Sequence, residues 1–101
     1  MQINTNLEVE QFIKSLEKST IAKTVRTIDL LEKFGYKIGM PHSKKVSDNL
    51  FELRIRGQQE VRIFYSYHKG DIYLLSGFVK KSQQTPEKQL AKAKAKFLAL
   101  T

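Results

Sequence analysis

The chain has 101 residues, with 18 Lys and Arg against 10 Asp and Glu, a formal net charge of +8 and no cysteine. This length suits a single domain over residues 1–101, and the 41% hydrophobic fraction is typical of a globular chain. The lack of cysteine excludes a disulfide framework, a thiolate zinc site and thiol catalysis, and no apolar run approaches the roughly 20 residues that span a bilayer. With no secretory signal visible, we expect a cytoplasmic protein whose positive charge favours nucleic acid or an acidic partner.

The charge is unevenly distributed along the chain. Residues 1–50 carry eight basic and six acidic residues, a balance of +2, whereas residues 51–101 carry ten and four, a balance of +6. We therefore expect the binding face to be built mainly by the second half. The closely spaced Lys92, Lys94 and Lys96 are instead interpreted as solvated side chains of a terminal helix.

Two helices are predicted in the first 35 residues. Thr5 and Glu8 fit a capping box, and a first helix should run to about Lys18 on an apolar stripe of Val9, Phe12, Ile13 and Leu16. A second helix should begin near residues 19–20 and end at Gly35, with a stripe of Ile21, Val25, Ile28 and Leu31. Together they predict a helical hairpin with one apolar side to bury.

The hydrophobic period then changes to two, which predicts strands. Residues 36–48 are expected to form a loop with a short strand near residues 45–47, followed by strands over residues 51–55, 61–67 and 72–80. The last of these is almost continuously apolar, as is typical of a central strand covered on both faces. Three strands linked by hairpins predict a small antiparallel sheet with helices packed on one side, an α+β fold.

A C-terminal helix is predicted to begin with Thr85 as N-cap, Pro86 at the first helical position and Glu87 in the first turn. Its apolar stripe is thin, and we expect loose docking through Leu90, Ala93, Phe97 and Leu100.

Common catalytic signatures are missing from the sequence. It has no Gly-rich phosphate loop, no His-x-x-x-His pair and no GxSxG motif, and His42 and His68 are far apart with no acidic cluster near either. No metal site and no cofactor are therefore expected.

Arginine on the predicted strands is the feature that points to function. Arg54, Arg56 and Arg62 alternate with core residues, and Lys80 and Lys81 follow the third strand, one for each face. If the core side faces the helices, the cations gather on an open sheet face. Such a face suits phosphate groups and stacked bases, and it makes RNA-binding candidates of Arg56, Lys45 and Tyr65. The alternative is a solvated surface on which the arginines pair with Glu52 and Glu60.

Clustered cations also permit a reaction. RNA is cut without a metal when its 2′-hydroxyl attacks the adjacent phosphorus, which requires a base, cations for the phosphorane charge and an acid for the leaving oxygen. A Lys side chain can serve as the base only where nearby positive charge or burial lowers its pKa.

Five sequence blocks add a resemblance to this pattern. They are LLEKFG (30–35), MPHxKK (40–45), LFELR (50–54), VRIFY (61–65) and GFVKKSQQTP (77–86), and the stretch that contains them is more than half of the chain. Their order and spacing resemble the phage-derived, HigB-like branch of the RelE/ParE toxin superfamily. The pair ELR…RIFY followed by GFVKKxxxTP is specific, whereas each block alone is weak.

The resemblance implies a RelE-like fold, with an N-terminal helical hairpin packed on a small antiparallel twisted sheet, plus a C-terminal helix. It implies the toxin of a type II toxin–antitoxin system, a ribosome-dependent mRNA endoribonuclease (mRNA interferase) that inhibits translation and is neutralised by a cognate helix-turn-helix antitoxin. The resemblance also implies roles for the matching residues. Arg62 would bind the scissile phosphate, Lys81 or Lys80 would be the transition-state cation or proton shuttle, and Arg54 would support them.

Two departures from that pattern change the expectations. Only residues 1–4 could supply the first strand, so a neighbouring sheet edge should be open to a partner. No Tyr or His follows Tyr73, so the chemistry would depend on Lys and Arg. The alternatives are a ParE-type, gyrase-directed toxin without nuclease activity and an inactive remnant that only binds its partner.

Overall fold

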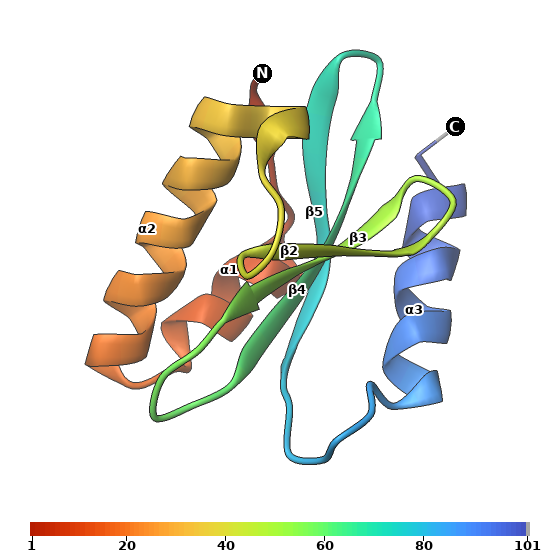
Figure 1. Ribbon diagram of the computed structural model, residues 1–101. Coiled ribbons are helices and arrows are strands. Elements are labelled where there is room, and N and C mark those ends of the chain that lie inside the picture. The colour runs from red at the N-terminus through yellow and green to blue at the C-terminus, as the bar shows by residue number, and fades with distance from the viewer. Residues whose placement is uncertain (101) are drawn as a thin grey trace.

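A five-stranded sheet lies between two helices on one face and a third helix on the other (Figure 1). The structure is a computed structural model and describes residues 1–100. In chain order the elements are β1 (Ile3–Asn4), α1 (Leu7–Lys14), α2 (Lys18–Phe34), the short 3-10 helix η1 (Gly35–Lys37), β2 (Ser43–Ser47), β3 (Leu50–Ile55), β4 (Val61–His68), β5 (Asp71–Val79) and α3 (Glu87–Leu98). No helix within these residues combines the length and apolarity needed to cross a membrane.

The α+β fold and the antiparallel core of the sheet are confirmed. The strand order is β1-β5-β4-β3-β2, and consecutive strands from β2 to β5 pair antiparallel. The two-residue β1 pairs parallel with β5, as a stub of the expected first strand. The period of two correctly predicted β3 and β4, and the continuous apolar run predicted β5, whereas β2 begins two residues earlier than predicted.

The first helix is capped by Asn6, and the predicted capping box at Thr5 is wrong. The Asn6 Oδ1 atom accepts a hydrogen bond from the Val9 amide at 2.8 Å. Its Nδ2 atom also donates to the carbonyl oxygens of Leu74 and Leu75, which follow the two residues of β5 that pair with β1. Asn6 therefore starts α1 and fixes it to the sheet. The helix ends at Lys14 rather than near Lys18, and α2 starts directly afterwards.

The buried face of α2 differs from the predicted apolar stripe. Its fully buried residues are Thr20, Thr24, Thr27 and Leu31. Val25 is 47% exposed, whereas Ile21 and Ile28 are partly buried against the core. The helix ends as predicted at Gly35, whose φ of +51° is a conformation that glycine adopts at little cost.

The second face of the sheet is covered, which corrects the prediction of an open sheet face. Helix α3 covers it over a second core cluster made of Leu50, Phe64, Leu75, Phe78 and Ala93. The cap of α3 is Pro86, without a side-chain hydrogen bond, so the predicted capping role of Thr85 is wrong. The apolar side chains on both faces of β5 require cover on both sides, and α1 and α3 supply it (Figure 1).

Two of the C-terminal lysines, although accessible to solvent as expected, also connect α3 to α1. Lys92 Nζ lies 2.6 Å from one carboxylate oxygen of Glu8, and Lys96 Nζ lies 2.5 Å from the other. These hydrogen bonds hold the pKa of the Glu8 carboxyl below its usual value. Lys94 has no such partner among the described residues and is exposed, as expected.

Replacing Glu8 by Gln should lower the free energy of unfolding by about 0.5 kcal/mol at neutral pH, because exposed ion pairs contribute little. Because the pKa of Glu8 is lowered, this stabilisation is fully present above pH 4.5, the ordinary pKa of the group. It is lost as the pH falls through the lowered pKa of Glu8. Urea unfolding at several pH values would measure it. Glu10→Gln is the control, since Glu10 lies in the same first turn. A Glu8→Gln effect that persists in acid would contradict the assignment.

Candidate functional site

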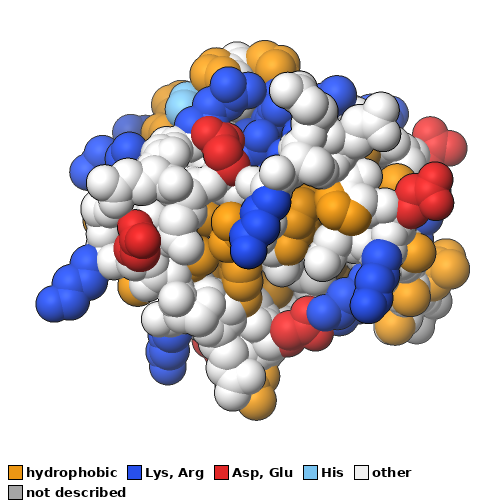
Figure 2. Space-filling view, turned by 90° about the horizontal axis from the view of Figure 1, so that it is seen from below, with side chains coloured by type: hydrophobic (Ala, Val, Ile, Leu, Met, Phe, Trp, Pro, Cys, Tyr) orange, Lys and Arg blue, Asp and Glu red, His pale blue; other side chains and the backbone are white. Residues whose placement is uncertain are grey.

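A cleft of about 630 Å³ lies where β3 and β4 meet the loop that follows β5; we call it the central cleft. The residues that line it are Arg54, Arg56, Glu60, Arg62, Lys80, Lys81, Ser82 and Gln83. The structure thus brings together all five cations that the sequence placed on or near the strands. Seen from below, Lys and Arg side chains lie at several points of this end of the molecule, with Asp and Glu side chains among them (Figure 2).

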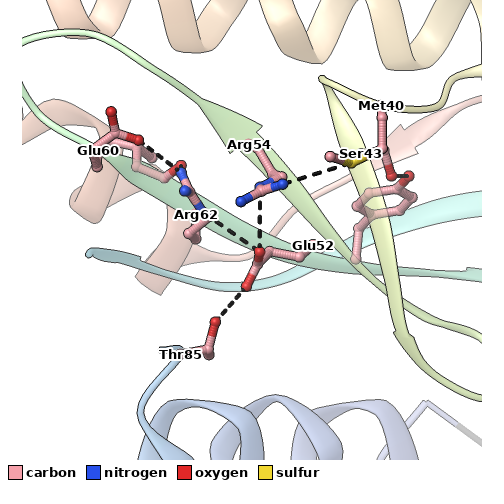
Figure 3. A network of polar contacts seen from close by, with 9 residues as sticks. Met40, Ser43, Glu52, Arg54, Glu60, Arg62 and Thr85 are labelled. Atoms are coloured by element: carbon pink, nitrogen blue, oxygen red, sulfur yellow. Dashed lines mark hydrogen bonds and ion pairs between the residues drawn. The ribbon is translucent and has the colours of Figure 1, made fainter. Parts of the chain in front are cut away.

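The floor of the central cleft is a compensated group of charges. Arg54 and Arg62 are directly opposite each other on neighbouring strands, where like charges repel. The Oε1 atom of Glu52 lies 3.7 Å from Arg54 Nε and 3.4 Å from Arg62 Nε. Its Oε2 atom accepts a hydrogen bond of 2.8 Å from the Thr85 hydroxyl. One buried carboxylate therefore stabilises both guanidinium groups (Figure 3).

Arg62 is the most constrained cation of the floor. Its Nη1 atom lies 3.3 Å from a carboxylate oxygen of Glu60 and donates to the Val61 carbonyl at 3.0 Å, and its side chain is only 3% exposed. The predicted open sheet face is therefore wrong at this position, and the alternative pairing with Glu52 and Glu60 holds for Arg62. Burial is possible because the guanidinium is paired on two sides.

The rim of the central cleft carries the uncompensated charge. Among residues 1–100, no ion pair is found for Arg56, Lys80 or Lys81. Arg56 and Lys81 are exposed, and Lys80 is half-buried. Both lysines line the cleft, contrary to the expectation that they face opposite sides, because β5 ends at Val79 and strand alternation stops there. The Lys80 amide donates to the Glu60 carbonyl at 2.6 Å, which fixes this segment beside β4.

Two smaller pockets adjoin the central cleft. The β2-side pocket, of about 380 Å³, shares Arg54 and Lys80 with it and is lined by the exposed Lys44 and by the predicted candidate Lys45. The α2-side pocket, of about 270 Å³, shares Arg54 and Arg56 with it. Arg54 lines all three cavities, so they meet at this side chain.

Tyr65 lies outside this site, and its predicted contact with RNA is contradicted by its burial. The side chain is 1% exposed in the core beneath α1 and α2, and its hydroxyl is hydrogen-bonded to the Ser43 hydroxyl. Burial raises the pKa of the Tyr65 hydroxyl. The ring also stacks against Phe51 at 5.3 Å, so neither a base nor a phosphate can reach it.

Several site residues escaped prediction from the sequence. The sequence predicts Glu52 only as a surface partner of arginine, although an acidic residue between core positions of a strand also indicates a buried ion pair. Lys23 and Arg26 line the α2-side pocket, and their spacing of three on a helix places them side by side. Thr85 was assigned to a helix cap, which its sequence context favoured.

This arrangement suits a polyanion rather than a metal. Arg and Lys side chains that lie close together and have free hydrogen-bond donors bind phosphate oxygens, and Arg does so through two parallel hydrogen bonds. The part of the chain that the structure describes contains no group of three or more His, Asp or Glu that could hold a metal ion.

Replacing Glu52 by Gln should lower the free energy of unfolding by about 3 kcal/mol, because the facing Arg54 and Arg62 lose their shared buried counter-charge. Glu60→Gln is the control, since Glu60 is 42% exposed, and it should cost less than about 1 kcal/mol. Adding Arg62→Met to Glu52→Gln should recover part of the loss, because it removes one of the two repelling charges. Urea unfolding would measure all three, and equal stability of the two Gln variants would contradict the assignment.

The comparisons with known proteins agree with this architecture. The chain is similar to the isolated RelE toxin of E. coli, with a TM-score of 0.60 and 10% identity over 93% of this chain and 97% of that one. It is also similar to a chain of the archaeal RelE–RelB complex of Pyrococcus horikoshii OT3, with a TM-score of 0.53 and 17% identity over 83% and 97% of the two chains. No curated protein matches the sequence. The model of the family described as "Phage derived protein Gp49-like (DUF891)" matches residues 11–97, and the chain therefore belongs to this family.

Proposed function

We propose that this protein is the toxin of a type II toxin–antitoxin system and acts as a metal-independent endoribonuclease on mRNA. The observation that carries the proposal is the central cleft, where uncompensated Arg56, Lys80 and Lys81 stand above a fixed floor of Arg54 and Arg62. Membership of the Gp49-like family and the fold shared with RelE toxins support it. The order of the sequence blocks supports a place in the HigB-like branch.

The reaction requires only RNA and proton transfer. The 2′-oxygen of a ribose attacks the adjacent phosphorus and gives its proton to a base, while the bond from phosphorus to the 5′-oxygen breaks and that oxygen takes up a proton. The products are a 2′,3′-cyclic phosphate end and a 5′-hydroxyl end. Fixed cations near the phosphorus stabilise the extra negative charge of the phosphorane, which is the main contribution a protein can make.

The burial of the side chains suggests how the roles divide. Lys81 or Lys80 contacts the scissile phosphate and transfers protons, because their amines have no ion pair within the described chain and line the cleft. Arg56 stands beside them on the rim. Arg62, 3% exposed, and Arg54, 13% exposed, supply fixed positive charge from below. This changes the role expected for Arg62 from direct phosphate binding to support of the phosphate from the floor.

The proposed partners follow from the same chemistry. A net charge of +8 favours fast, salt-sensitive association with ribosomal RNA, and we propose that the substrate is mRNA on the ribosome in the cytoplasm. A RelE chain occurs in complex with RelB in the archaeal structure. We propose that a cognate antitoxin, of the helix-turn-helix type, neutralises this protein.

The variant Lys80→Ala/Lys81→Ala should slow mRNA cleavage at least about 100-fold and abolish growth arrest, because both rim amines are lost from the cleft. The measurement is induced expression in bacteria, with growth followed and mRNA ends mapped for 2′,3′-cyclic phosphates. Lys88→Ala/Lys94→Ala is the matched control, since it removes the same charge from exposed positions of α3.

Three outcomes would contradict the proposal. Full toxicity of Lys80→Ala/Lys81→Ala would show that the site is misassigned. DNA damage with intact mRNA would favour a gyrase-directed toxin. Growth unaffected by the wild-type protein would favour an inactive, partner-binding remnant.

A further inference from the structure

The α2-side pocket contains residues that the proposed cleavage does not use. It lies between α2 and β3, has a volume of about 270 Å³ and shares Arg54 and Arg56 with the central cleft. Pockets for drug-sized ligands begin at about 300 Å³, so this one suits a single nucleotide rather than a longer segment.

The α2 wall of the pocket presents two cations without a partner. Lys23 and Arg26 are exposed, and they lie three residues apart, on one side of the helix. No ion pair of either residue occurs in the part of the chain that the structure describes. Two neighbouring free cations on a fixed helix are suited to one phosphate group.

The rest of the pocket combines apolar and planar groups. Leu30, Pro41 and the buried Ile55 supply apolar surface. Arg54, Arg56 and His42 supply flat groups, and nucleobases stack on guanidinium planes and on imidazole rings. A binding site for phosphate alone would not need this apolar surface, whereas a nucleotide matches both parts.

The shared wall connects the pocket to the proposed cleavage site. Because Arg54 and Arg56 line both cavities, these two side chains form a wall that the central cleft and the pocket share. An RNA chain whose phosphate lies in the central cleft would therefore place a neighbouring nucleotide at the pocket.

We propose that the α2-side pocket binds one nucleotide of the RNA next to the scissile phosphate, with its base against Arg54, Arg56 and His42 and its own phosphate on Lys23 and Arg26. The proposal rests on the proposed function, since it takes RNA as the ligand. It makes α2 part of the binding surface.

The test is titration of the isotope-labelled full chain with a 2′-O-methyl tetranucleotide, followed by NMR. This RNA cannot be cut because its nucleophile is blocked, and NMR detects weak binding. Lys23→Ala/Arg26→Ala should reduce affinity about tenfold and lower the slope of log K against log salt by about 1, as expected for a lost phosphate contact. Lys18→Ala/Lys33→Ala is the control, with the same charge removed from exposed positions of the same helix, and should change affinity less than about twofold.

An abasic site tests the base separately. When the abasic site is moved along the tetranucleotide, it should reduce the affinity of the wild type about tenfold at one position. In Lys23→Ala/Arg26→Ala the same abasic site should reduce the affinity by less, because base and phosphate belong to one nucleotide. Equal affinity of Lys23→Ala/Arg26→Ala and Lys18→Ala/Lys33→Ala for the tetranucleotide would overturn the proposal. Loss on Lys23→Ala/Arg26→Ala with no sensitive abasic position would also overturn it, in favour of a simple phosphate site.

Failure of this proposal can be told apart from failure of the proposed function. If only the pocket is misassigned, Lys80→Ala/Lys81→Ala still slows mRNA cleavage and abolishes growth arrest. If that variant is as toxic as the wild type, the cleavage site is misassigned, and if the wild type leaves mRNA intact, the RNA-cleaving function itself is wrong. No binding of the tetranucleotide by the wild type would overturn the nucleotide pocket.

Discussion

The carboxylate of Glu52 holds together parts of the molecule that would otherwise repel one another. It lies on the same face of β3 as Arg54, two residues away, and diagonally across from Arg62 on β4. Because Arg54 and Arg62 are directly opposite, the sheet could not keep this register at low cost without a buried negative charge. Through Thr85 the same carboxylate holds the segment that leads from the cleft into α3. Site geometry and the placement of the last helix thus depend on one side chain.

This arrangement divides the positive charge of the cleft into two kinds. The floor charges of Arg54 and Arg62 are held by contacts with the Glu52 and Glu60 carboxylates, so their positions are set before any ligand arrives. The rim charges of Arg56, Lys80 and Lys81 have no such partners within the described residues and stay available to a ligand. Preorganised charge costs little reorganisation when a new negative charge develops, whereas mobile charge can follow a changing ligand. The cleft combines both properties within one surface.

The strands could be predicted because their alternation is a direct result of the pleat. Hydrophobic periodicity gave the wrong buried face for α2, because polar side chains occupy positions where apolar ones were expected. Thr20, Thr24 and Thr27 of this helix face the protein core, whereas Val25, which belongs to the predicted stripe, is exposed. The compact threonine side chain can pack, and the Thr27 hydroxyl is satisfied by the carbonyl of Lys23 at 2.8 Å. A hydrophobicity pattern does not register that possibility.

The grouping of the cleft cations could be predicted from the sequence, whereas the burial of Arg62 could not. Residue type and strand position were enough to group Arg54, Arg62 and the two lysines, because pairing of adjacent strands brings them together. Arg62 is buried in ion pairs with Glu52 and Glu60, and Glu52 is in turn held by Thr85, 33 residues further along the chain. The apolar run of β5 did indicate cover on both faces, but a sequence does not say which helix provides it.

Asn6 gives the short N-terminal strand a consequence for the behaviour of the protein in solution. Beyond Asn4, the edge of β5 is occupied by the amide of this side chain, which also begins α1. Loss of the side chain would shorten the helix and expose unpaired carbonyl groups in the same event. Exposed strand edges recruit strands from other molecules. Damage at this corner should therefore appear first as self-association between copies that still have their native core.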